Sequence, residues 1–248
     1  MPDKFVIVTG VQGNIGQAIA KDLEKSGFAV IGMDIKVSES VPCDHFIQID
    51  LAKYFLDPEY LSKKNRQIRK IMKNGMLHAL VNNAATQKID STANLSLQDF
   101  HESQVVNVCA PFALVKSFLT DLTKTGGAVV NISSIHSSLT KPQFVAYASS
   151  KAGLTGLTNA LAVDIGAMGV KTFAIEPAAI DTDMLRSGFS GNPEALAKLN
   201  EYHPTMKIGQ PEEVAGITSY LINGASSFLN GSVIKLTGGI HGRLHDPD

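Results

Sequence analysis

"KFVIVTGVQGNIGQAIA", residues 4–20, joins a short apolar run to three closely spaced glycines and then to an amphipathic segment. The run rich in Val and Ile predicts a strand, and the segment after the glycines predicts a helix. Gly10, Gly13 and Gly16 therefore lie where a strand turns into a helix. Glycines let a backbone approach a phosphate closely, and a helix N-terminus adds amides and partial positive charge. The stretch predicts an anion-binding turn, although a purely structural tight turn would have the same pattern.

The same alternation of short apolar runs and longer amphipathic segments continues along the chain. Strands are expected at 5–10, 28–34, 45–50, 76–84, 127–134, 170–177 and 231–239. Helices are expected at 14–26, 58–74, 97–123, 145–168 and 211–223. Such alternation predicts an α/β fold with a doubly wound parallel sheet of about seven strands and helices on both faces.

The chain has neither a linker nor a repeat, so we expect one domain over residues 1–248. Its least regular region is 181–210, which we expect to act as a mobile lid over a substrate. It contains four residues that interrupt regular structure: Gly188, Gly191, Pro193 and Pro204.

Composition and charge exclude several classes of function. Of the 248 residues, 44% are hydrophobic, and 22 basic residues nearly balance 23 acidic ones, so nucleic acid is not an expected partner. No run approaches the roughly 20 apolar residues of a membrane span, and no signal peptide is expected. Cys43 and Cys109 lie far apart, which indicates free thiols rather than a disulfide or a metal site. The sequence predicts a soluble cytoplasmic protein without a bound metal.

Two acidic residues end strands near the glycine turn. Asp34 ends the second expected strand, 18 residues after Gly16, where a carboxylate can bind a ribose 2′-hydroxyl of a dinucleotide. Because this carboxylate would repel a 2′-phosphate, it favours NAD over NADP, although the neighbouring Lys36 leaves NADP open. Asp50 ends the third strand, where it could accept a hydrogen bond from adenine or simply be solvated.

A tyrosine and a lysine lie four residues apart in "AYASSKAGLTG" at 146–156. On a helix this spacing places Tyr147 and Lys151 on one face. A nearby cation lowers the pKa of a phenol toward the range in which it can exchange a proton. Ser134 precedes Tyr147 by 13 residues at the end of a strand and could face the same cleft. The short pattern alone is equally typical of an exposed helical pair.

Together these motifs resemble those of the short-chain dehydrogenase/reductase family over nearly the whole chain. The similar segments are "TGVQGNIG" at 9–16, "NNAA" at 82–85, Asn107 within "VVNVCAPF", the Ser134, Tyr147 and Lys151 set, "PAAIDT" at 177–182, "GQPEEVA", and "NGSVIKLTGG". The resemblance implies a Rossmann-type fold and an oxidoreductase that interconverts a secondary alcohol and a carbonyl by hydride transfer with NAD.

The resemblance also implies roles for individual residues. Tyr147 would be the general acid/base, Ser134 would hydrogen-bond the substrate oxygen, and Lys151 would lower the tyrosine pKa and bind the nicotinamide ribose. Asn107 would hold a water in a proton relay. The implied cofactor contacts are Gly10, Asn14, Ile15 and Gly16 at the glycine turn, Asp34, Asp50, Leu51 and Asn83 toward the adenosine, and Ile180 and Thr182 toward the carboxamide.

Three positions depart from the family pattern, because Asn14, Ala85 and Ala178 stand where the family has glycine. Asparagine tolerates left-handed backbone geometry better than most residues, so we expect the turn to survive. The two alanines each add a methyl group beside the cofactor. We therefore expect a slightly reshaped cleft with all four catalytic positions intact.

His136 and Gln87 are expected to face the substrate, although a loop histidine bonded to backbone and a solvated glutamine would have the same pattern. The segment around His136 resembles bacterial glucose 1-dehydrogenases, and "NNAATQ" with that histidine resembles 3-hydroxybutyrate dehydrogenases. The lysine that the second group places before its tyrosine is absent: Phe144 occupies the position and Lys141 comes three residues earlier. We expect a polar sugar-like or polyhydroxy alcohol, with a 3-hydroxy acid as the alternative.

Two further expectations concern class and assembly. Because a fold does not fix a function, a catalytically silent nucleotide-binding regulator is the alternative from another class, and the intact catalytic set argues against it. The expected helices at 97–123 and 145–168 are apolar on more than one face, which predicts a homo-oligomer. In enzymes of the family these helices pack against another subunit, usually within a tetramer.

Overall fold

The computed structural model describes residues 4–37, 43–73, 75–189 and 191–244. Parts of three expectations lie outside these residues: both ends of the 1–248 domain, residue 74 of the expected helix 58–74, and residue 190 of the expected lid.

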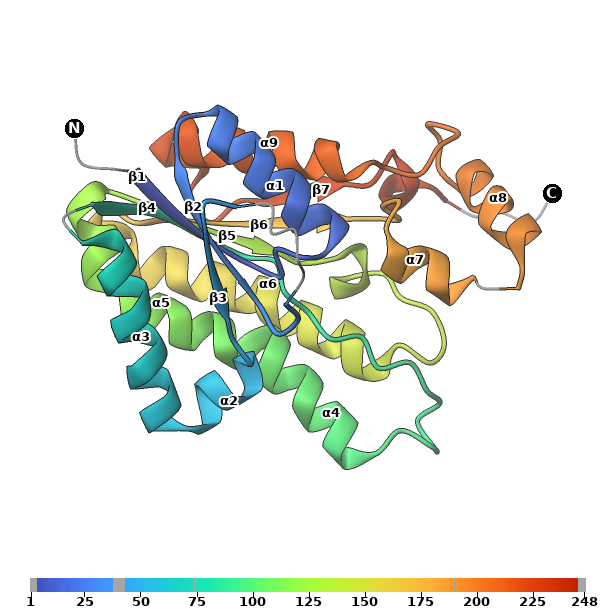
Figure 1. Cartoon of the computed structure of the whole chain (residues 1–248). Coiled ribbons are helices and arrows are strands. Elements are labelled where there is room, and N and C mark those ends of the chain that lie inside the picture. The colour runs from blue at the N-terminus through green and yellow to red at the C-terminus, as the bar shows by residue number, and fades with distance from the viewer. Residues whose placement is uncertain (1–3, 38–42, 74, 190, 245–248) are drawn as a thin grey trace.

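Seven parallel strands form one sheet in the order β3-β2-β1-β4-β5-β6-β7, which confirms the predicted fold class (Figure 1). Their bounds are β1 Lys4–Thr9, β2 Ala29–Asp34, β3 His45–Gln48, β4 Met76–Asn82, β5 Ala128–Ile132, β6 Lys171–Pro177 and β7 Val233–Leu236. Every described strand pair is parallel, so the carboxyl ends of all seven strands lie at the same edge of the sheet.

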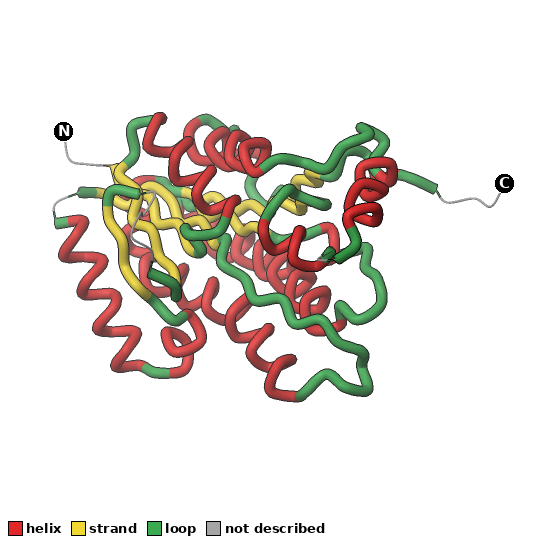
Figure 2. Tube along the Cα trace, turned by 45° about the vertical axis from the view of Figure 1, so that its right-hand side comes forward, coloured by secondary structure: helices red, strands yellow, loops and turns green. Residues whose placement is uncertain are grey.

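Helices cover both faces of this sheet (Figure 2). α1 (Asn14–Lys25) and α9 (Pro211–Asn223) lie on one face, and α3 (Pro58–Met72), α5 (Ala110–Thr125) and α6 (Val145–Ile165) lie on the other. Alternate residues of one strand enter different cores: Phe5 and Ile7 belong to the cluster under α3, α5 and α6, and Val6 and Val8 to the cluster under α1 and α9. This two-sided burial is why the strands are apolar throughout rather than alternating.

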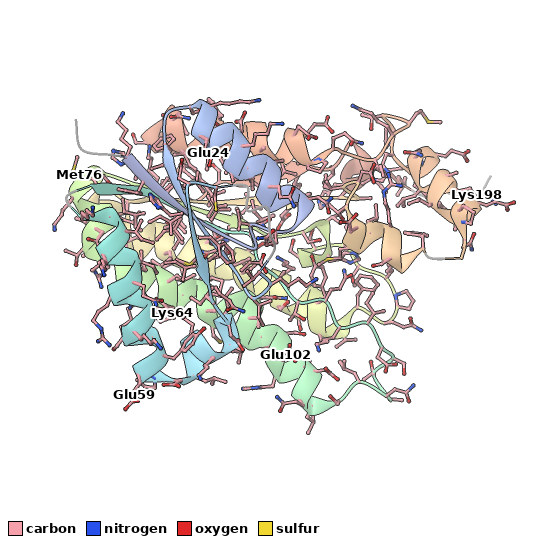
Figure 3. The ribbon with its side chains drawn as sticks, viewed as in Figure 1. Glu24, Glu59, Lys64, Met76, Glu102 and Lys198 are labelled. Atoms are coloured by element: carbon pink, nitrogen blue, oxygen red, sulfur yellow. The ribbon has the colours of Figure 1, made fainter. Side chains whose placement is uncertain are left out.

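Most charged side chains lie on the outside of these layers, and Lys151 and Glu176 are buried exceptions. Glu59 at the start of α3 and Lys198 on α8 (Pro193–Tyr202) extend away from the sheet (Figure 3). Both residues are exposed.

Three helices were not expected: α2 (Leu51–Leu56), α7 (Asp183–Gly188) and α8. Each begins after a side chain that caps it, namely Asp50, Thr182 and Asn192 respectively. A cap satisfies an otherwise unpaired backbone amide and so favours even a short helix at that point. The expected lid at 181–210 is therefore largely helical rather than irregular.

The expected helix at 97–123 is interrupted. α4 (Leu97–Gln104) is followed by a turn of π-helix at Val105–Cys109 and then by α5. The whole run Leu97–Thr125 is long and apolar enough to cross a membrane, contrary to the sequence expectation. Half of its apolar window is buried inside the protein, and α5 packs on β4, as the core helix of a globular fold does.

The strand order reverses between β1 and β4. In doubly wound sheets, the loops that leave the carboxyl ends of two such strands diverge to opposite faces and leave a crevice between them. Asp34 is the last residue of β2, and Gly10, Asn83 and Ser134 follow the carboxyl ends of β1, β4 and β5 within two residues. The fold therefore gathers them along one edge.

Candidate active site

The glycine turn packs too tightly for side chains at two positions. Gly10 has a φ of 68°, and a Cβ there would lie 2.8 Å from the Cα of Ala84. A Cβ on Gly16 would lie 2.1 Å from the carbonyl oxygen of Gly10, so α1 could not approach the turn. No side chain caps α1, and its first turn has no acidic residue. The glycines thus allow β1, α1 and the loop after β4 to pack closely. The turn also leaves the N-terminus of α1 without a side-chain cap, where an anion can bind.

Asn14 does not have the left-handed geometry that the sequence analysis considered. It is the first residue of α1, and the non-glycine residues with positive φ in the described chain are Lys73, Gln143 and Met206. Its Oδ1 accepts a hydrogen bond of 3.0 Å from the backbone N–H of Asp183 at the start of α7. The side chain at this position therefore joins the glycine turn to the lid segment.

Asp34 lies beside the glycine turn, as predicted. Its Oδ2 accepts from the N–H of Gln12 at 3.0 Å, and its Oδ1 accepts from the N–H of Lys36 at 3.0 Å. Each oxygen retains a further lone pair. These two bonds hold the carboxylate in place and leave it able to accept from the hydroxyls of a ribose.

The residues expected near the adenosine also have structural roles. Asp50 caps α2 by accepting from the N–H of Lys53 at 3.1 Å, and Leu51 is buried behind it. The amide of Asn83 donates to the carbonyls of Thr9 and Gly10 at 3.0 and 3.1 Å. Asn83 therefore joins the ends of β1 and β4, between which the crevice opens.

Tyr147 and Lys151 are buried rather than exposed, which excludes a solvated helical pair. Their relative exposures are 9% and 2%, and the lysine Nζ lies 5.6 Å from the centroid of the tyrosine ring. Nζ donates to the carbonyl of Ile132, the last residue of β5, at 2.7 Å. Ser134 follows two residues later, and its Oγ accepts from the N–H of His136 at 3.1 Å. The structure brings all three predicted catalytic side chains to the end of β5.

Burial changes the pKa values of this pair in opposite directions. It raises the pKa of Tyr147 to about 12, while a hydrogen bond with Ser134 acts in the lowering direction. It lowers the pKa of Lys151 to about 7. The expectation that Tyr147 has a lowered pKa is therefore wrong for the protein by itself. Loss of water around the phenolate outweighs the stabilising contacts, and the lysine is only partly charged at neutral pH.

Asn107 lies in the π-helical turn between α4 and α5. Its Oδ1 accepts from the N–H of Thr86 at 2.9 Å, and its Nδ2 donates to the Thr86 carbonyl and to Ser150 Oγ, both at 2.9 Å. The side chain thus ties the loop after β4 to α6, one residue before Lys151. Turns of π-helix are frequent at functional sites because they redirect one side chain within a helix.

His136 packs within an aromatic wall beside Tyr147. Its ring stacks on Phe144 with centroids 4.5 Å apart and meets Tyr147 edge-on at 5.9 Å. Its Nδ1 lies 3.0 Å from Thr140 Oγ1, so the ring pairs with a side-chain hydroxyl rather than with backbone. Burial, aided by the charge of Lys141, lowers the pKa of His136 to about 4. The ring is therefore neutral at physiological pH.

The remaining predicted residues border the same edge. Ile180 is buried and forms a β-bridge with Gly209, and Thr182 caps α7 through the N–H of Leu185 at 3.1 Å. Ile15 and Gln87 are half-buried. The described residues contain no group of three or more His, Cys, Asp or Glu side chains placed to hold a metal ion.

The sequence analysis missed two residues at this edge. Thr9 Oγ1 accepts from the N–H groups of Asn83 and Ala84, both at 3.0 Å. The sequence could have indicated Thr9, because it is a polar residue at the end of an apolar strand. Gln143, just before Phe144, has a φ of 72°, and its carbonyl accepts from the N–H of Asp90 at 3.1 Å. Nothing in its sequence context indicates this strained conformation, of a kind that clusters at functional sites.

The chain is similar in sequence and structure to known oxidoreductases. A family described as enoyl-(acyl carrier protein) reductase, within the short-chain dehydrogenases, matches residues 10–241. An uncharacterized oxidoreductase of Thermotoga maritima is 33% identical over 95% of this chain and 96% of its own. The aldohexose dehydrogenase of Thermoplasma acidophilum superposes with a TM-score of 0.90 at 27% identity, covering 99% of this chain and 98% of the other. An NADP-bound 3-oxoacyl-(acyl-carrier-protein) reductase from Agrobacterium tumefaciens has a TM-score of 0.82 at 25% identity, covering 95% and 93% respectively.

Burial of Lys151 predicts a pH-dependent stability. The unfolded chain keeps this proton up to the ordinary lysine pKa of 10.5, whereas the folded protein loses it near pH 7. Between these values the unfolded state binds more protons, so the free energy of unfolding should rise with pH. Relative to Lys151→Met, the native protein should gain up to about 1.4 kcal/mol per pH unit between pH 7 and 9. Urea unfolding of both proteins across this range provides the measurement, and parallel pH curves would contradict the shift.

Proposed function

The chain belongs to the short-chain dehydrogenase/reductase family of oxidoreductases, and we propose that it is an NAD(H)-dependent enzyme that interconverts a secondary alcohol and a carbonyl. The observation that carries this proposal is the burial of Tyr147 and Lys151 on one face of α6, at the sheet edge where Asp34 and the uncapped N-terminus of α1 also lie. A proton-transfer group and a dinucleotide site thus share one edge.

The residues of this chain have distinct roles in the proposed reaction. NAD, when bound, would accept the hydride of the alcohol. The Tyr147 oxygen would take the hydroxyl proton, and Ser134 would hydrogen-bond the same substrate oxygen. Lys151 sets the acidity of Tyr147, because an ammonium 5.6 Å from the ring stabilises a phenolate and a neutral amine does not. Contacts that raise the pKa of Lys151, such as hydrogen bonds from its ammonium group to ribose hydroxyls, would keep the lysine charged. The charged lysine would then stabilise the Tyr147 phenolate, which can accept a proton. We retain the proposed relay through Asn107, whose side chain is bonded to Thr86 and Ser150.

The cofactor assignment rests on Asp34. A carboxylate held by two backbone amides suits the hydroxyls of an adenosine ribose and repels a 2′-phosphate. Asp50, Leu51 and Asn83 would border the adenosine, and Ile180 and Thr182 the carboxamide end. NADP is the less favoured cofactor, although the Agrobacterium relative binds it.

The substrate that we propose is a polar sugar-like or polyhydroxy alcohol. A neutral His136 offers one hydrogen-bond donor and one acceptor, which suits hydroxyl groups better than a carboxylate. Gln87 would supply further polar contacts. The structural likeness to an aldohexose dehydrogenase supports the same class. A 3-hydroxy acid is the alternative, since the Lys141 ammonium lies 4.7 Å from the centroid of the Phe144 ring, behind His136.

Several broader expectations stay proposals. We propose one catalytic domain over residues 1–248, a cytoplasmic location, and a lid formed by residues 181–210. The hydrogen bond from Asp183 to Asn14 supports the lid, because it joins this segment to the edge of the cofactor site. A catalytically silent nucleotide-binding regulator is the alternative from another class.

We predict a homo-oligomer and propose that it is a tetramer. Large apolar side chains on α4–α6 and the turn after them are exposed to solvent: Leu97, Phe100, Phe112, Val145, Val163 and Met168. Exposed apolar surface of this kind indicates an interface. Light scattering at micromolar concentration should give a mass several times the 26.4 kDa of one chain. A monomeric mass would contradict the prediction.

The native enzyme should prefer NAD over NADP by at least about tenfold in kcat/KM, which corresponds to roughly 1.4 kcal/mol. Replacing Asp34 with alanine removes the negative charge that repels the 2′-phosphate of NADP, so Asp34→Ala should narrow this ratio. Steady-state assays with each cofactor measure both effects. Equal use of the two cofactors by the native enzyme would show that a cation such as Lys36 dominates recognition.

A panel of sugars, polyols and hydroxy acids, read by nicotinamide absorbance, tests the function and discriminates the two substrate classes. On the best alcohol of the panel, Tyr147→Phe should lower turnover by at least the roughly 10²–10⁴ that a positioned acid/base contributes. NADH affinity should persist in this variant, because the phenol is not a main cofactor ligand. Retention of most activity by Tyr147→Phe would contradict the proposed reaction and favour another mechanism.

A further inference from the structure

A buried carboxylate lies beneath the catalytic groups and has no role in the reaction described above. Glu176 on β6 is 3% exposed. Among the described residues it forms no ion pair. A carboxylate removed from water is costly unless hydrogen bonds replace its hydration. Its contacts therefore indicate what the protein gains by placing an acid there.

One oxygen of Glu176 accepts hydrogen bonds from two different elements. Ser137 Oγ donates to Oε1, and Thr155 Oγ1 donates to the same atom at 2.9 Å. Ser137 ends the short 3₁₀ turn Ile135–Ser137 that follows Ser134, and Thr155 lies on α6 one turn after Lys151. A single carboxylate thus joins the turn that carries Ser134 to the helix that carries Tyr147.

The connection continues to the backbone of Lys151. Ser133 Oγ has two acceptors within reach of its single proton, Thr155 Oγ1 at 2.9 Å and the carbonyl of Lys151 at 3.0 Å, and can donate to one of them at a time. The N–H of Ser133 in turn donates to the carbonyl of Ile175 at 2.8 Å, next to Glu176 on β6. The hydroxyls of Ser137 and Thr155 therefore converge on Glu176, and Ser133, the residue after β5, lies beside Thr155.

Glu176 adds a hydrogen-bonded support to the 3₁₀ turn, which also contacts α6 through the edge-on pair of His136 and Tyr147. β5 ends at Ile132, and the backbone bonds within the turn are internal, from Ser137 N to Ser134 O at 2.9 Å and from Leu139 N to Ile135 O at 2.9 Å. Internal bonds hold the shape of a turn but do not fix its position relative to α6. Ser134 must nevertheless lie at a defined distance from Tyr147 to contact the same substrate oxygen.

We propose that Glu176 is a positioning residue, which through Ser137 and Thr155 fixes Ser134 and His136 relative to Tyr147 and Lys151. The proposal rests on the proposed function, in which Tyr147 and Ser134 act on one substrate oxygen. Glu176 itself touches neither substrate nor cofactor in this role.

Substitution of Glu176 tests the proposal on the best alcohol of the panel. Glu176→Ala should lower kcat by about tenfold or more, because small misplacements of catalytic groups slow a reaction strongly. Glu176→Gln should lose distinctly less, since an amide oxygen can still accept from both hydroxyls. NADH affinity should stay within about twofold in both variants, because Glu176 does not touch the cofactor in this role.

The pH profile separates positioning from a general loss of stability. A hydrogen bond with Ser134 lowers the pKa of Tyr147, so a displaced Ser134 should let that pKa rise. The rising limb of alcohol oxidation should then move to higher pH in Glu176→Ala and less so in Glu176→Gln. A variant that was merely less stable would keep the native profile below its melting temperature.

The hydroxyls of Ser137 and Thr155, which donate to Glu176, provide a test that does not depend on Glu176→Ala being folded. Ser137→Ala and Thr155→Val should each lower kcat, and the double variant should be little worse than the poorer single one, because both act through one carboxylate. Ser138→Ala is the matched control, since this exposed serine follows in the same segment and should leave kcat unchanged.

The outcomes separate this proposal from the proposed function. If Tyr147→Phe abolishes turnover while folded Glu176→Ala, Ser137→Ala and Thr155→Val all keep native kcat and pH profiles, the positioning role is overturned and the reaction stands. If Tyr147→Phe retains turnover, the proposed function fails, and the positioning role fails with it.

Discussion

All seven strands run in the same direction, so their carboxyl ends meet at one edge of the sheet, and the site depends on this constraint. The strand order reverses between β1 and β4, and the connections leave that edge toward opposite faces. Residues separated by more than 130 positions, such as Gly10 and Tyr147, therefore border one crevice. The helices on both faces bury most residues of the central strands β1, β4, β5 and β6.

Burial of polar groups at this edge determines their chemistry. Lys151 lies in a buried position with its Nζ on the carbonyl of Ile132, and its pKa falls to about 7. Tyr147 beside it is neutral over a wide pH range, and the pKa of His136 falls to about 4. Burial thus favours the neutral form of each of these three side chains. Charge developing there during a reaction would be little screened by water, so small changes in position have large energetic effects.

Hydrogen bonds between polar side chains and neighbouring elements connect the parts of the site. Asn107 ties α6 to the loop after β4, Asn83 ties β4 to β1, and Glu176 receives hydroxyls from the turn after β5 and from α6. Asn14 extends the same principle to the lid segment, because a side chain where the family has glycine binds the first N–H of α7. A hydrogen bond therefore joins the start of α1 to the start of α7.

The amino-acid sequence by itself determined the strand order along the chain, the long helices, the glycine turn, the acid at Asp34, and the positions of Ser134, Tyr147 and Lys151 on and near α6. These features are local, since apolar runs, glycines and four-residue spacings report directly on backbone structure and on which side chains share a face. Strand ends and most helix ends differ from expectation by only a few residues. The tertiary structure alone decided the pKa values of Tyr147 and Lys151, the helical geometry of Asn14, and the contacts of Glu176. Each depends on how much water is excluded, or on which distant atoms come near, and both follow from packing between segments that are remote in sequence.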